Sequence, residues 1–93
     1  MREYFTCPCC GYITLESEHE YDICPICFWE DDWIQFEEVD LKGGANNVSL
    51  RQAQKNYIEF GACEKEMLCH VRKPTVDDIK DENWNVLYKG DEL

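Results

Sequence analysis

Two cysteine turns, Cys7-Pro8-Cys9-Cys10-Gly11 and Cys24-Pro25-Ile26-Cys27, decide the fold of this chain, and 13 residues separate Cys10 from Cys24. Proline after the first cysteine of each turn fixes φ near −65° and removes one backbone donor, which shapes the turn for chelation. Four thiolates in this spacing can close a tetrahedron around one ion. We therefore predict a single structural Zn²⁺ bound by Cys7, Cys10, Cys24 and Cys27. The alternative is four buried or disulfide-linked cysteines without a metal.

The two cysteine turns differ at the residue that follows the second cysteine. Gly11 can adopt φ > 0, which lets backbone N–H groups point at sulfur and offset its negative charge. Phe28 stands at the matching place, where φ > 0 would be strained. We therefore expect the second cysteine turn to be less regular than the first.

Length and cysteine count indicate a small protein of a reducing compartment. A chain of 93 residues buries only about 60 to 65% of its unfolded surface, so a metal staple would help it fold. The cysteine count of seven is odd, and no charged segment followed by an apolar one opens the chain, so we expect a cytoplasmic protein with metal ligands rather than disulfides. The longest apolar run, 23–29, is far shorter than the roughly 18 residues of a membrane span, so we expect no membrane association.

The charge of the chain points to a basic partner. Twenty acidic against nine basic residues give a formal net charge of −11. Because nucleic-acid binding depends on Lys and Arg that neutralise phosphates, we expect no nucleic acid ligand, and a protein with a basic surface is the better match. Trp29 and Trp33 lie beside Glu30, Asp31 and Asp32. We predict that they form an aromatic anchor inside a solvated acidic rim, and we assign these carboxylates no catalytic role.

Strand signals surround the cysteine turns. The aromatic and β-branched residues of 4–6 and 12–15 predict a hairpin across the first cysteine turn. Residues 21–23 alternate into the second turn and predict a third short strand. Residues 28–41 mix large apolar with acidic side chains and receive no assignment. The loop that contains His19 is polar, so we expect the imidazole to be exposed.

The clearest helix runs from Ser49 to Phe60. Ser49 with Gln52 forms a capping box, and Gly61 ends the helix in a left-handed conformation. One face carries apolar side chains at helical spacing: Leu50, Ala53, Tyr57, Ile58 and Phe60.

Signals after this helix are weaker. A shorter helical stretch is expected at 64–70, with Met67, Leu68 and Val71 facing inward. Thr75 and Asp78 can cap a further turn, and 84–88 can form a strand.

The remaining cysteines allow three interpretations. Cys9 is best explained as a small core residue. A second metal site made of Cys9, Cys63, Cys69 and His70 is an alternative. A reactive thiol in a Cys-Pro-Cys-Cys redox motif is another, but a thioredoxin-like fold needs a βαβ pattern that this sequence lacks.

Several motifs in order resemble the cysteine-rich CPCC family of small, mainly bacterial proteins. They cover about residues 4–74 and comprise the stretches 7–12, 24–32, 43–46 running into 48–50, 56–57 with 59–63, and 71–74. The resemblance implies that Phe28 is usual for the family at the second cysteine turn. It raises Cys63 as a ligand or core residue and leaves Cys69 and His70 outside the motif. The family has no established activity, so the resemblance implies a site and no function.

These observations predict an α+β protein with a small zinc-ribbon-like antiparallel sheet, one main helix and short helical turns. We expect a single domain over 1–93, with a zinc-ribbon-like part at about 4–36, a helical part at about 49–71 and an acidic C-terminal segment at 75–93. The expected function is a non-catalytic protein-interaction module. Two alternatives are a thiol or zinc redox switch that uses Cys9, and an acidic inhibitor of a basic partner.

Overall fold

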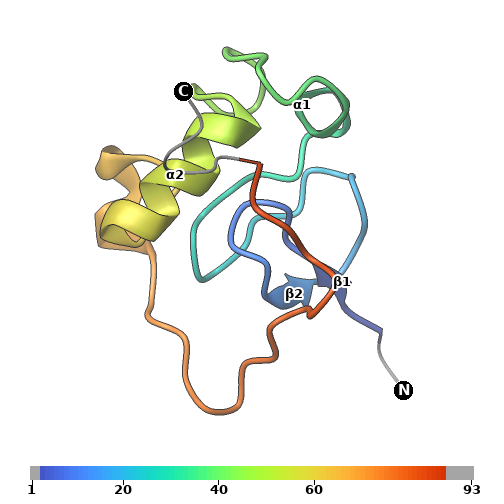
Figure 1. Ribbon diagram of the computed structural model, residues 1–93, viewed down its shortest axis with the longest axis vertical. Coiled ribbons are helices and arrows are strands. Elements are labelled where there is room, and N and C mark those ends of the chain that lie inside the picture. The colour runs from blue at the N-terminus through green and yellow to red at the C-terminus, as the bar shows by residue number, and fades with distance from the viewer. Residues whose placement is uncertain (1–2, 88–93) are drawn as a thin grey trace.

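The fold is α+β: a two-stranded antiparallel sheet lies beside two α-helices and one 3-10 helix (Figure 1). The structure is a computed structural model that describes residues 3–87. In chain order the elements are β1 (Phe5–Thr6), β2 (Ile13–Leu15), α1 (Trp33–Glu37), α2 (Leu50–Phe60) and the 3-10 helix η1 (Lys65–His70).

The predicted hairpin across the first cysteine turn is present. Phe5 pairs with Leu15 and Thr6 with Ile13, with an irregularity between the two pairs. The predicted third strand at 21–23 is wrong, because Ile23 forms only an isolated bridge with Glu30 across the second cysteine turn. Tyr21 has φ 69°, a left-handed conformation that interrupts an extended strand.

Residues 28–41, which the sequence left unassigned, contain the short helix α1. Asp32 caps its N-terminus, since the Asp32 carboxylate accepts hydrogen bonds from the backbone N–H groups of Ile34 (2.8 Å) and Gln35 (3.3 Å). Gln35 is the buried residue of α1, and its side chain bonds the loop that follows at Leu41 O, Asn46 N, Asn46 O and Val48 O.

Helix α2 confirms the prediction made from its two ends. The Ser49 hydroxyl accepts from Gln52 N at 3.1 Å, and Gly61 takes φ 93° at the C-cap. The Gln52 side chain donates to Asn56 Oδ1 instead of closing the capping box. The predicted apolar face is correct at its N-terminal end, where Leu50 and Ala53 are buried, and wrong at Ile58, which is 60% exposed.

The segment after α2 contains less regular structure than the sequence allowed. The predicted helical stretch is the 3-10 helix η1, in which Met67 packs against the core but Leu68 is 44% exposed rather than inward-facing. Thr75 and Asp78 close a turn through the Thr75 N–H, which donates to Asp78 Oδ2 at 2.6 Å. Residues 84–87 are not a strand, and Tyr88 lies outside the described residues, as do the remaining residues of the predicted acidic end.

Residues 79–87, here termed the C-terminal strap, run back along the hairpin (red in Figure 1). The Ile13 N–H donates to Ile79 O at 2.9 Å and the Asp81 N–H donates to Gly11 O at 2.8 Å. The strap therefore fastens onto the first cysteine turn. Beneath it lies a core formed by six cysteines and a few larger side chains, among them Leu15, Ile26, Trp29 and Leu50.

Candidate metal centre

The two cysteine turns have the same backbone geometry. In the first turn the Cys7 N–H donates to Tyr12 O and the Gly11 N–H donates to Cys7 O, both at 2.9 Å. The second turn repeats both bonds at the equivalent positions, at 3.0 and 2.8 Å. Phe28 takes φ 69° where Gly11 takes φ 83°. The expectation of a less regular second turn is therefore wrong: Phe28 adopts the conformation that glycine adopts in the first turn.

The matched turns bring four sulfur atoms together. The Sγ atoms of Cys7, Cys10, Cys24 and Cys27 all lie within 4.8 Å of one another. The Cys7–Cys27 separation is 3.5 Å and the Cys10–Cys24 separation is 3.7 Å. A tetrahedral site with Zn–S bonds of about 2.3 Å has S···S edges of about 3.8 Å. The sulfurs thus have the spacing of a tetrahedral four-sulfur site that could hold a metal ion.

Burial and hydrogen bonding shift the pKa values of these cysteines in different directions. Hydrogen bonds from the Cys10, Cys27 and Cys7 thiols hold the pKa of Cys24 far below its ordinary value. Burial raises the pKa of both Cys7 and Cys27 well above the ordinary value. One thiolate is therefore favoured by its neighbours, and further thiolates in this buried cluster need a cation beside them.

Two donors orient the Cys24 sulfur. The Thr14 hydroxyl donates to Cys24 Sγ at 3.1 Å from strand β2, and the Ile26 N–H lies at 3.4 Å from the same sulfur. Sequence reasoning missed the role of Thr14, because nothing in a strand pattern shows which threonine faces a sulfur. Such outer contacts fix the orientation of a metal ligand and stabilise its charge.

The other cysteines do not form a second cluster. Cys9 and Cys63 are both buried, and burial raises the pKa of each thiol. Cys69 is exposed, and His70 stacks on the Phe28 ring at 4.8 Å. Within residues 3–87, the only group of three or more potential metal ligands is the four-cysteine cluster. The structure therefore does not bring the proposed second site together, and it places Cys9 in the core.

The predicted aromatic anchor with its acidic rim is wrong in most of its parts. Trp29 is fully buried, as is Asp31, and Asp32 is buried as the cap of α1. Only Trp33, 48% exposed, fits the anchor.

His19 is also not the exposed residue that the sequence suggested. Its backbone N–H donates to Asp31 Oδ2 at 2.6 Å, and its ring lies 4.1 Å from the Phe36 ring. Burial is the main cause of the raised pKa of Asp31, while the contacts with His19 act in the opposite direction. The Asp31 and Asp32 carboxylates thus bind backbone N–H groups of nearby segments instead of facing solvent.

The carbonyl oxygen of Pro8 fastens the first cysteine turn to two distant segments. Gln54 Nε2 of α2 and Trp84 Nε1 of the C-terminal strap each donate to Pro8 O at 2.8 Å. Gln54 is buried although it is polar. Sequence reasoning missed both side chains, because their partner is a backbone atom far away in the chain.

Comparison with known proteins supports a family assignment. A family model described as Cysteine-rich CPCC matches residues 5–78, which contain both cysteine turns and α2. No protein of curated function matches the chain. Among residues 3–87, no helix is long and apolar enough to cross a membrane.

Proposed function

Because the chain belongs to the cysteine-rich CPCC family and its two cysteine turns converge, we propose that it is a structural zinc protein that serves as a non-catalytic interaction module. Zn²⁺ bound by Cys7, Cys10, Cys24 and Cys27 would supply the positive charge that four buried thiolates require. The protein's own contribution is to hold the four sulfurs at fixed spacing, to exclude water from them and to orient Cys24 through Thr14.

One observation carries this proposal: the four clustered cysteines are all fully buried. A site with four protein ligands has no open position for a substrate or an attacking water. This closure supports a structural role over a catalytic one. Burial of Cys9 and its raised pKa disfavour the redox-switch alternative, because a reactive cysteine is exposed and has a low pKa.

The interaction role rests on charge and on α1. The formal net charge of −11 favours a basic protein partner in the cytoplasm and disfavours nucleic acid. Trp33, Ile34 and Phe36 on α1 are exposed apolar side chains, which is typical of a contact surface. An inhibitor that neutralises a basic partner would use the same surface, and its association would slow as ionic strength rises through about 0.15 M.

Metal analysis after purification without added metal tests the zinc proposal. We expect one zinc ion per chain, lost in Cys24→Ser and retained in Cys69→Ser, because Cys69 is an exposed cysteine outside the cluster. Iron is the competing occupant of a four-sulfur site. Recovery of iron, or of folded protein without metal, would contradict the assignment.

A further inference from the structure

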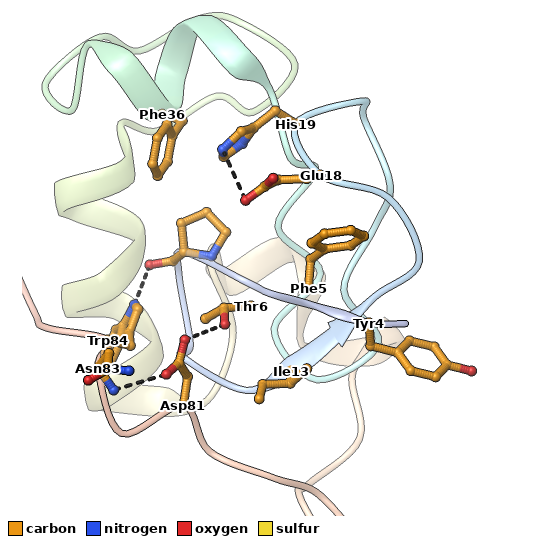
Figure 2. A pocket seen from close by; sticks show the side chains of 11 residues that line it. Tyr4, Phe5, Thr6, Ile13, Glu18, His19, Phe36, Asp81, Asn83 and Trp84 are labelled. Carbon is orange, nitrogen blue, oxygen red and sulfur yellow. Dashed lines mark hydrogen bonds and ion pairs between the residues drawn. The ribbon is translucent and has the colours of Figure 1, made fainter. Parts of the chain in front are cut away.

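A cavity of about 430 Å³ opens beside the first cysteine turn and has no assigned role (Figure 2). Its volume lies in the range of about 300 to 1,000 Å³ that is typical of ligand sites. Its walls come from the β1–β2 hairpin, the loop that carries His19, α1 and the C-terminal strap. Among residues 3–87, the side chains that line it include no lysine or arginine.

Aromatic rings form much of the cavity wall. Phe36 and His19 stand on one side and Trp84 on another (Figure 2). The Trp84 ring is held in place by the bond from its Nε1 to Pro8 O at 2.8 Å. The same ring already contacts a cation of the chain itself, since Lys80 Nζ lies 4.9 Å from its centroid, although Lys80 does not line the cavity. Aromatic faces of this kind attract a guanidinium or ammonium group.

Two carboxylates add negative charge to the same cavity. Asp81 accepts hydrogen bonds from the Thr6 hydroxyl and, at 2.9 Å, from the Asn83 N–H. These bonds keep the carboxylate in place and hold its pKa below the ordinary value, so it is ionised at neutral pH. Glu18, whose side chain is 60% exposed, lies across the cavity near His19 (Figure 2). The cavity thus combines aromatic faces with two carboxylates.

We propose that this cavity receives an arginine side chain from the surface of the partner protein. The proposal deepens the function proposed above and rests on it, since it requires the partner to be basic. Arginine fits better than lysine, because a planar guanidinium stacks on aromatic rings and donates to carboxylates through several N–H groups. The exposed Trp33 and Ile34 of α1 do not line the arginine site.

Binding of a defined peptide to the zinc-loaded full chain tests the proposal. The probe is an acetylated and amidated Gly-Gly-Arg-Gly-Gly peptide, added at low salt, and the matched probe carries uncharged citrulline in place of arginine. The readout is the NMR resonance of the Trp84 indole N–H. The indole of Trp29 is fully buried and does not line the cavity, so its resonance is the internal reference. We expect the arginine peptide to shift the Trp84 resonance saturably and the citrulline peptide to leave it unchanged.

Charge-removing variants locate the contact. Glu18→Gln and Asp81→Asn should each weaken arginine-peptide binding at least about fivefold, because each removes a charge-assisted contact. Glu59→Gln removes the same charge from an exposed position on α2 outside the cavity and should change the affinity less than about twofold. Asp81 also accepts a hydrogen bond from the Thr6 hydroxyl, so Asp81→Asn removes a structural contact as well as a charge. If that variant misfolds, Glu18→Gln alone tests the arginine site.

Three results would overturn the cavity proposal: no binding of the arginine peptide, equal binding of the citrulline peptide, or a shift at Trp33 without one at Trp84. None of them affects the zinc proposal, which metal analysis decides separately. A basic protein that binds through α1 while the Trp84 resonance stays fixed would likewise overturn the arginine site and leave the interaction module intact.

Discussion

Phe28 gives the second cysteine turn a left-handed backbone conformation that residues with a side chain rarely adopt. Its φ of 69° costs a residue with a side chain about 1 to 2 kcal/mol. The Phe28 ring is half-buried against the core and stacks on His70 at 4.8 Å. Its N–H donates to Cys24 O at 2.8 Å. Packing of the ring and closure of the turn therefore offset the backbone strain.

Gly11, the equivalent residue of the first cysteine turn, gives the first prediction. A Cβ atom there would lie 2.6 Å from two carbon atoms of the Trp84 ring, and φ is +83°. Gly11→Ala should combine backbone strain with displacement of the ring and lower the free energy of unfolding by about 3 kcal/mol. Urea unfolding of the zinc-loaded protein measures this change.

Gly43→Ala is the control for that measurement. Gly43 has a similar φ of +86°, but nothing lies within 4 Å of a Cβ atom built there. We expect only the backbone cost of about 1 kcal/mol. Equal losses in the two alanine variants would show that Trp84 does not press against the first cysteine turn.

At the scale of elements, the two α-helices begin with caps of unequal strength. The Asp32 carboxylate accepts from Ile34 N and Gln35 N within α1, and also from Ala45 N at 3.0 Å in the following loop. Ser49 accepts one bond, from Gln52 N. Asp32 therefore caps α1 and also connects the helix to the loop at Ala45 by a hydrogen bond.

The second prediction compares these caps. Asp32→Ala should lower the free energy of unfolding by about 2 kcal/mol or more, because it leaves three N–H groups near a buried position unpaired. Ser49→Ala should cost about 1 kcal/mol. Thermal unfolding of both variants checks the order, with Glu37→Ala as an exposed control on α1 that we expect within about 0.5 kcal/mol of wild type. A larger loss in Ser49→Ala would contradict the proposed role of Asp32.

The two helices also show what local sequence can predict. Helix α2 has eleven residues, a serine cap and a terminal glycine, and these signals act within the element itself. Helix α1 has five residues, too few for a periodic pattern. The acidic run that contains its cap predicts a solvated surface, whereas Asp32 is buried because it contacts a loop at Ala45 that local patterning does not place there.

The candidate site likewise has features that local sequence predicts and features that depend on distant contacts. The four clustered cysteines follow from their spacing, because each Cys-x-x-Cys turn closes locally. Burial of Trp29 and Asp31 could not be predicted from local sequence. The Asp31 carboxylate accepts a hydrogen bond from the backbone N–H of His19, which lies twelve positions away. The cavity was equally beyond local patterning, because its walls join residues from Tyr4 to Trp84.

At the scale of the whole molecule, Gln54 links three segments. Its Nε2 donates to Pro8 O at 2.8 Å, and its Oε1 accepts from Leu87 N in the C-terminal strap. The third prediction is that Gln54→Leu lowers the free energy of unfolding by about 2 kcal/mol, because the Leu87 N–H loses its acceptor. Urea unfolding measures the loss. Gln52→Leu, at an exposed position of the same helix, is the matched control and should change stability little.

The fourth prediction concerns metal removal. Structural zinc contributes on the order of 10 kcal/mol, so a chelator should abolish near-native structure, and Cys24→Ser should prevent folding. Cys9→Ser should cost only about 1 to 2 kcal/mol, because it buries a hydroxyl in the core and removes no cluster sulfur. Circular dichroism with and without EDTA checks each case. Full thermal stability in EDTA, or equal metal loss from both variants, would contradict the assignment of the ligands.

The bond between Trp84 and Pro8 O joins residues 76 positions apart, and this separation has a consequence for synthesis on the ribosome. The chain emerges from its N-terminus at about 5 to 20 residues per second. All four cluster cysteines precede position 28, so the last of them is made roughly three to eleven seconds before Trp84 at that rate. The nascent chain therefore has time to acquire an ion while its sulfurs are still open to solvent. The strap, made after both cysteine turns, then covers a first cysteine turn that a bound ion would already have closed.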